Sequence, residues 1–163
     1  FSDRIEISNP GTLLPSLKVE RLIDTAPESR NELFAALMRR MGICEERGSG
    51  IDKALFAVEV YGLPPVDFVN GPNVFKAVLY SPREFKRMSM EERLRACYQH
   101  CCLRYVSGEP MTNASFRKRL GLHDDQYSVA WKIIDLALEK EPIKPRDIKS
   151  RSRKFAAYVP FWA

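Results

Sequence analysis

The chain has 163 residues, of which 45% are hydrophobic and 29% are charged, and its formal net charge is +5. This composition excludes disordered and collagen-like proteins and is typical of a globular protein with one good core or two small ones. No apolar run approaches the roughly 18 to 20 residues that span a bilayer, and no signal-peptide pattern is present. We therefore expect a cytoplasmic protein with no membrane partner.

The charge is divided unevenly along the chain. Residues 1–82 carry a net charge of −2, whereas residues 83–163 carry +7. A basic excess of this size in one half points to a polyanionic partner for that half. The chain also starts with Phe1 and enters a strand pattern at once, which favours a fragment of a longer protein.

The first part of the chain predicts a strand followed by a helix. Residues 4–8 alternate apolar and polar side chains, and the Asn9-Pro10-Gly11 turn ends that pattern. Ser29 and Glu32 have the spacing of a capping box, and apolar residues then recur at helical spacing over 33–41. We expect this helix to pack on a sheet.

A second helix and a hairpin complete the first half. The Gly48-Ser49-Gly50 loop precedes a second amphipathic helix over 51–61, and residues 66–69 and 74–80 read as two strands joined by a turn. The pattern predicts an α/β unit over residues 1–82, with its helices on one side of a small sheet.

The second half shows three helices followed by a basic hairpin, the order of a winged helix. Ser89 and Glu92 form a capping-box pattern before the first helix, Thr112 caps a second over 113–120, and Asp124 opens the third. We expect a winged-helix domain over residues 86–163, so that the whole protein is α+β.

A winged helix holds DNA with its third helix in the major groove while cations of the wing neutralise phosphates. Asp124 and Asp125 at the start of the third helix would face DNA unfavourably, which favours binding dominated by the wing. The expected contacts are cations or side chains that reach base edges: Arg117, Lys118, Gln126, Ser128, Lys132, Lys144, Arg146, Lys149, Arg151, Arg153 and Lys154.

Other chemistry has little support in the sequence. The four cysteines lack metal-ligand spacing, and we expect them to be buried or half-buried free thiols. His100 and His123 have no Ser or Cys partner in a suggestive context. We therefore predict no catalytic residues and no metal site.

Several segments carry a resemblance to a known family. RIEISNPG, SRNELFAALMRRMG, ERGSGIDKA and YGLPPVDFV in the first half, with NASFRKRLGL and KSRSRKFAAYVPFWA in the second, resemble the C-terminal region of bacterial RecG-related "ATP-dependent DNA helicases" and transcriptional regulators. The resemblance implies a divergent GHKL-type ATPase domain followed by a winged helix. It also implies a preceding Schlafen-type AlbA-like domain that is absent here.

The resemblance assigns a nucleotide site to two loops. Asn9 and Gly11 fall where the family's adenine-binding Asp-x-Gly motif should be, and Gly48, Ser49 and Gly50 fall where its phosphate loop should be. Asn9 replaces the adenine-binding Asp, and the upstream helix with the Mg²⁺-binding Asn is missing. We expect no cofactor and no ATP hydrolysis in this chain. Binding of ATP and Mg²⁺ is an expectation for the intact parent protein only.

Three functions stay open on the sequence alone. The first is a transcriptional regulator that binds DNA through the winged helix. The second is a nucleic-acid-associated protein that binds or hydrolyses ATP, of which this chain is a non-catalytic part; it would not be a helicase motor, because no GxxxxGK[ST] motif is present. The third is an interaction module that forms a homodimer through a truncated sheet edge. For Gly48 and Gly50, the alternative to phosphate binding is a tight loop that requires positive φ.

Overall fold

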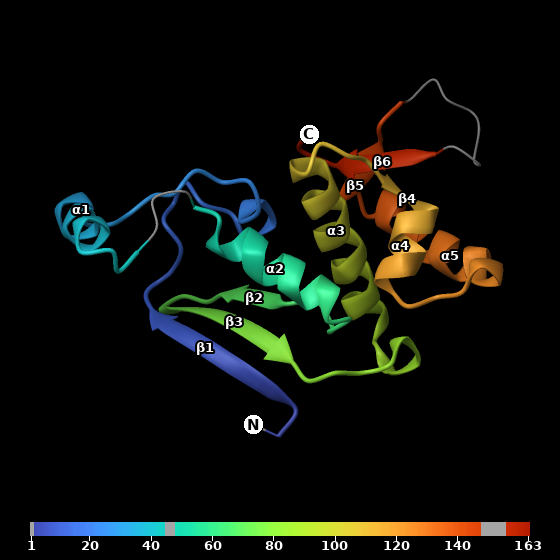
Figure 1. Ribbon diagram of the computed structural model, residues 1–163, viewed down its shortest axis with the longest axis horizontal. Coiled ribbons are helices and arrows are strands. Elements are labelled where there is room, and N and C mark those ends of the chain that lie inside the picture. The colour runs from blue at the N-terminus through green and yellow to red at the C-terminus, as the bar shows by residue number, and fades with distance from the viewer. Residues whose placement is uncertain (1, 45–47, 148–155) are drawn as a thin grey trace.

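The computed structural model describes residues 2–44, 48–147 and 156–163, and their fold is α+β, which confirms the predicted class (Figure 1). The first half contains β1 (Arg4–Pro10), the short 3-10 helix η1 (Val19–Arg21), α1 (Glu32–Arg40), α2 (Gly50–Val60), β2 (Asp67–Asn70) and β3 (Val74–Tyr80). The second half contains η2 (Phe85–Arg87), α3 (Met90–Val106), β4 (Met111–Thr112), α4 (Asn113–Arg119), η3 (Asp124–Gln126), α5 (Tyr127–Glu139), β5 (Ile143–Pro145) and β6 (Ala157–Pro160).

The first half is built on an antiparallel sheet with strand order β1-β3-β2, in which β2 and β3 form the predicted hairpin. Helix α2 packs on this sheet through Leu55 and Val58, which are buried in a cluster that includes Ala77 and Leu79 of β3. One helix therefore covers the face formed by β2 and β3.

Strand β1 extends the same sheet face beyond α2. Ile5 lies directly opposite Leu79 and Ile7 opposite Ala77, and residues paired in this way share a face. Ile5 is nevertheless 65% exposed and Ile7 is also exposed. Strand β1 therefore has the predicted alternation of apolar and polar side chains, but no helix among the described residues covers its apolar face.

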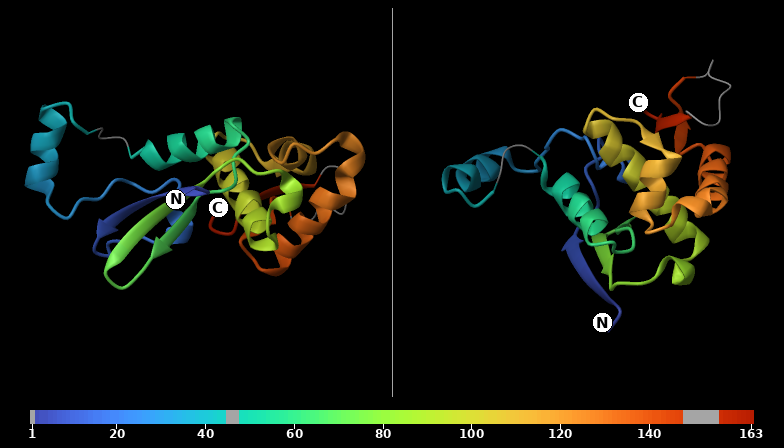
Figure 2. Two further views of the ribbon diagram at one scale, coloured as in Figure 1. Left: turned by 90° about the horizontal axis from the view of Figure 1, so that it is seen from below. Right: turned by 45° about the vertical axis from the view of Figure 1, so that its right-hand side comes forward.

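Helix α1 corrects the prediction that the first helix packs on the sheet. It stands away from the rest of the molecule in all views (Figures 1 and 2), none of its residues is buried, and Leu33 is 84% exposed. An amphipathic pattern shows which face of a helix could be buried, but it does not say that the same chain supplies the partner. The predicted cap is also wrong, because Asn31 accepts the hydrogen bond from the Phe34 amide while Ser29 bonds the Glu32 side chain.

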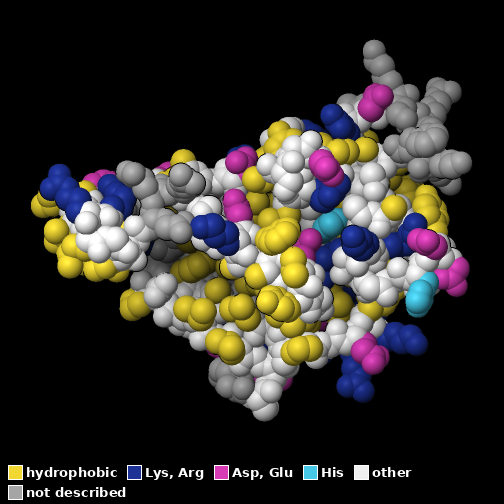
Figure 3. Space-filling view, in the orientation of Figure 1, with side chains coloured by type: hydrophobic (Ala, Val, Ile, Leu, Met, Phe, Trp, Pro, Cys, Tyr) yellow, Lys and Arg dark blue, Asp and Glu magenta, His cyan; other side chains and the backbone are white. Residues whose placement is uncertain are grey.

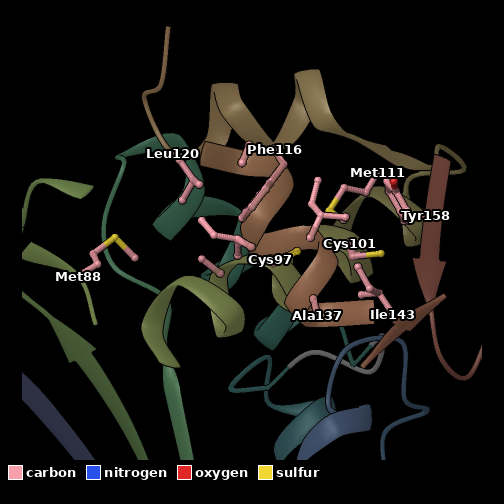
Figure 4. Close-up of a cluster of buried hydrophobic side chains, with 13 residues drawn as sticks. Met88, Cys97, Cys101, Met111, Phe116, Leu120, Ala137, Ile143 and Tyr158 are labelled. Carbon is pink, nitrogen blue, oxygen red and sulfur yellow. The ribbon is translucent and has the colours of Figure 1, made fainter. Parts of the chain in front are cut away.

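The second half forms the predicted three helices around a compact core. Capping boxes at Ser89 and Thr112 start α3 and α4, as the sequence indicated. The sheet has strand order β4-β6-β5 and is antiparallel throughout. Phe116, Met111 and Cys97 belong to the buried cluster that these elements enclose (Figure 4). The winged-helix assignment and the domain boundary near residues 82–86 stay predictions.

Helix α3 joins the two halves. Cys97 and Cys101 face the core of the second half, whereas Cys102 and Leu103 belong to the cluster under α2. Because one helix contributes to both cores, the two halves pack against each other. No described helix has the length and apolar character needed to cross a membrane.

Candidate functional site

The two loops assigned to nucleotide binding lie at the ends of β1 and α2. Asn9 is exposed and paired with Phe75 in the sheet, and the Gly11 amide donates to the Asn73 carbonyl at 2.9 Å. Gly11 has φ +86°, a conformation that favours glycine. The Arg30 guanidinium lies beside Gly11 and bonds the Thr12 carbonyl.

The Gly48-Ser49-Gly50 segment starts α2, with Ser49 as its N-cap residue. Gly48 has φ +66°, and a Cβ at this position would lie 3.0 Å from Cδ of Pro27. The tight-loop explanation for this glycine therefore has geometric support, because its positive φ and its close contact with Pro27 both disfavour a side chain. Nucleotide binding by these two loops stays a prediction.

The predicted basic cluster on α4 is divided between solvent and protein. Arg117 donates to Asp124 at 2.6 Å and to Asn113 at 3.0 Å, so its charge is shared with a neighbouring carboxylate. Lys118 is exposed, whereas the side chain of Arg119 turns inward and is only 5% exposed. Within α4, Lys118 is therefore the cation best placed to meet an external anion.

Helix α5 presents both polar and acidic side chains at its start. The Gln126 side chain accepts from the His123 amide at 2.9 Å, which makes it part of the turn before α5. Ser128 and Lys132 are exposed, and so are the two acidic residues Asp124 and Asp125. Lys132 thus shares α5 with the exposed carboxylates Asp135 and Glu139, and Asp124 and Asp125 lie in η3 directly before this helix.

The predicted hairpin cations are only partly within the described residues. Lys144 of β5 donates to the Ala163 carbonyl at 2.5 Å, and Arg146 is exposed just after β5. Four further predicted cations lie outside the described residues: Lys149, Arg151, Arg153 and Lys154. The strands β5 and β6 that flank this segment are paired antiparallel, which agrees with the predicted hairpin.

A buried polar network at the junction of α2, α3 and α4 was not predicted. Nδ1 of His100 lies 3.0 Å from Glu59 Oε2, and Nε2 lies 3.1 Å from Ser115 Oγ. Arg119 Nε lies 3.4 Å from Glu59 Oε1, and its Nη2 donates to the Leu63 carbonyl at 2.8 Å. Burial lowers the pKa of Arg119, while the nearby Glu59 carboxylate raises it.

This network corrects the statement that His100 has no serine partner. Serine, imidazole and carboxylate within hydrogen-bond reach is the arrangement of a nucleophile with its base. Here, however, the Ser115 hydroxyl accepts from the Thr112 amide at 3.0 Å and donates to the Thr112 carbonyl at 3.0 Å. A hydroxyl bound in this way caps α4, so we assign the network a structural role that ties α2 to α3 and α4.

No short motif could have revealed the network. Glu59 precedes His100 by 41 residues and Ser115 follows it by 15. The only hint is that a histidine lies between apolar positions of an amphipathic helix, where it must find polar partners.

The cysteines of α3 are buried, as predicted, but Cys44 is exposed, which corrects the expectation for that residue. Cys97, Cys101 and Cys102 are buried free thiols, and Cys44 is an exposed one. Burial raises the pKa of all three buried thiols, to about 12 for Cys102. Within the described parts of the chain, no three His, Cys, Asp or Glu side chains gather as a metal site.

The C-terminal aromatic residues pack against both halves. Tyr158 is buried in the second core, and Nε1 of Trp162 donates to the Tyr98 hydroxyl at 3.0 Å. The Arg21 guanidinium stacks on the Trp162 ring, with its carbon 4.2 Å from the ring centroid. For Tyr158 and Trp162 the structure thus shows packing, and Phe155 lies outside the described residues.

Comparison with known proteins gives one family. Residues 1–79 match the family model described as "Putative ATP-dependent DNA helicase recG C-terminal". This match supports a RecG-related family. The matched segment contains β1, α1, α2 and β2 and nearly all of β3, and it includes both loops assigned to nucleotide binding. No curated protein and no solved structure matches the chain.

Proposed function

We propose that this chain is a DNA-binding transcriptional regulator in which residues 86–163 form a winged helix. The observation that carries the proposal is the element order α3, β4, α4, α5, β5, β6 combined with the strand order β4-β6-β5. A short first strand that pairs with the last strand of a C-terminal hairpin is what we expect of this architecture. The hairpin also carries the densest run of cations in the chain.

The charge distribution supports binding through phosphates. The second half has a net charge of +7, and the exposed cations Lys118, Lys132 and Arg146 lie on α4, on α5 and just after β5. Neutralising phosphates releases counterions, and this release supplies most of the affinity for non-specific DNA. Because Asp124 and Asp125 are exposed in η3, directly before α5, we propose that the wing contributes more than insertion of a helix into the groove.

Titration of a fluorescent DNA duplex at two salt concentrations tests this proposal. With about five phosphate contacts, the affinity should fall about 10² to 10³-fold between about 50 and about 200 mM salt. Lys132→Gln should weaken binding, whereas Lys18→Gln, which removes the same charge from the first half, should not. Absence of binding at low salt, or an affinity that does not depend on salt, would contradict the proposal.

A second candidate function is favoured by the family match. The description of the matched family names an ATP-dependent protein, and the two loops at Asn9 and Gly48 lie within the matched residues. In this alternative, the longer parent binds ATP and uses it to alter a nucleic-acid complex. Measurement of ATP turnover by the parent, with Mg²⁺ and with Mn²⁺, tests it, and no turnover with either metal would remove it.

We also propose that the first half pairs with a second copy of the chain. In the described sheet, β1 is hydrogen-bonded to β3 alone and is therefore an edge strand. Its neighbouring apolar side chains Ile5 and Ile7 are exposed on the face beside α2. Sedimentation equilibrium tests this proposal, and a purely monomeric species at all protein concentrations would contradict it.

A further inference from the structure

A cavity of about 410 Å³ opens between α2, α3 and α4, at the place where the two halves meet. Its volume is within the range of about 300 to 1,000 Å³ that is typical of small-molecule sites. The buried network of Glu59, His100 and Ser115 forms part of its wall. None of the residues assigned to nucleotide binding lines this cavity.

One side of the cavity is apolar. Phe56 and Val60 of α2 are largely exposed, and Leu103 of α3 lies beside them in the lining. Phe56 and Val60 are four residues apart, so they lie on one face of α2. Their exposed surface is not used in either hydrophobic core, and an apolar ligand group that covered it would be stabilised by the loss of water contact.

The other side is cationic. Lys118 is exposed and has no ion-pair partner among the described residues. Arg104 and Arg119 also line the cavity, but Arg104 is paired with Glu109 and Arg119 with Glu59. Hydrophobic and cationic side chains meet on this face of the molecule (Figure 3).

The balance of charge in the lining favours an anion. Glu59 is the one carboxylate among the residues that line the cavity, and its oxygens are already occupied by His100 and Arg119. Arg104 is paired with Glu109, which does not line the cavity, so Lys118 is the lining cation without an ion pair among the described residues. A ligand carboxylate could accept from the exposed Lys118 ammonium, which is a strong interaction because the donor is charged.

We propose that this cavity binds a small organic anion consisting of an apolar body and one carboxylate. The apolar body contacts Phe56, Val60 and Leu103, and the carboxylate is held by Lys118. No residue of α5 or of the hairpin lines this cavity, whereas Lys118 of α4 is both a lining residue and a proposed DNA contact. It is also separate from the loops assigned to nucleotide binding.

The test uses the whole chain without DNA, so that its outcome does not depend on the proposed regulator function. Amide signals in ¹H–¹⁵N correlation spectra are followed while sodium phenylacetate is added, and phenylacetamide serves as the uncharged control ligand. We expect saturable shifts at residues of α2, α3 and α4 with phenylacetate, and at least tenfold weaker binding of phenylacetamide.

Two variants complete the experiment. Lys118→Gln should weaken phenylacetate binding about tenfold, because it removes the exposed cation without disturbing a core. Lys132→Gln removes the same charge from α5 and should leave binding unchanged. The proposal is overturned if phenylacetate causes no saturable shifts, if phenylacetamide binds equally well, or if the two variants weaken binding to the same extent.

Discussion

The two halves of the chain differ in how completely their apolar side chains are buried. In the second half, Phe116, Met111 and Ile134 are fully buried between three helices and a small sheet. In the first half, Leu33 of α1 and Ile5 of β1 remain largely exposed, although both lie in clear amphipathic patterns. Hydrophobic periodicity therefore shows which face of a helix or strand could be buried. Whether that face is buried depends on which other elements pack against it.

The largest predicted effect is the difference in stability loss between a substitution in the core of the second half and one on α1 in the first half. Phe116→Ala should lower the free energy of unfolding by about 3 to 5 kcal/mol, because it leaves a cavity in a closed core. Phe34→Ala on α1 should change it by less than about 0.5 kcal/mol, because Phe34 is 57% exposed. Urea denaturation followed by circular dichroism measures both.

If Phe116→Ala does not fold, Phe116→Leu provides a smaller perturbation of the same site. Equal destabilisation by the substitutions at positions 116 and 34 would contradict the comparison. It would mean that α1 is packed in solution against another part of the protein or against a second copy.

The buried thiols predict an alkaline loss of stability. Burial holds the pKa values of Cys97, Cys101 and Cys102 above their unfolded value of about 8.5, so the folded state favours the protonated thiols. Their contribution is complete below about pH 8.5 and is lost as the pH rises towards the folded pKa, which is about 12 for Cys102. Between about pH 8.5 and 9.5 the free energy of unfolding should fall by about 3 kcal/mol, or about 1 kcal/mol per thiol.

Urea titrations at the two pH values measure this loss, and cysteine variants assign it. Cys102→Ala should remove about a third of the pH dependence, whereas Cys44→Ser should leave it unchanged, because Cys44 is exposed. A pH dependence that is the same in Cys102→Ala as in the unmodified protein would show that the buried thiols are not its source.

The junction between the halves should be sensitive to one carboxylate. Glu59→Gln should lower the free energy of unfolding by about 2 kcal/mol, because the buried Arg119 loses its charged partner and His100 loses a charged hydrogen bond. Glu109→Gln removes the exposed ion pair with Arg104 and should cost less than about 1 kcal/mol. Thermal and urea denaturation of the two variants compare them directly, and an equal effect would contradict the assignment of a structural network.

Much of the fold follows from short-range signals. The capping boxes at Ser89 and Thr112 located the starts of α3 and α4, and the Gly-containing turn before Val74 located the hairpin of β2 and β3. Each of these signals acts within a few residues of the structure it determines. Patterns of this kind can be read from one sequence.

The cap of α1, at Asn31 instead of Ser29, is a local error, but the larger errors concern contacts between distant segments. The exposure of α1 depends on which elements the chain places near it, and the His100 network joins residues that are 15 and 41 positions apart. The sequence also could not show that α4 cations differ in their surroundings, with Lys118 outside and Arg119 buried against Glu59. These features arise from tertiary packing, which a local pattern does not encode.

The central claim is that the basic hairpin of the second half binds DNA through phosphates. Fluorescence anisotropy with two duplexes of unrelated sequence tests it, using the unmodified chain and a variant in which Arg151, Arg153 and Lys154 are replaced by Ala. We predict weaker binding to both duplexes alike and a salt slope that is smaller by about 3. An unchanged affinity and an unchanged slope would contradict the claim.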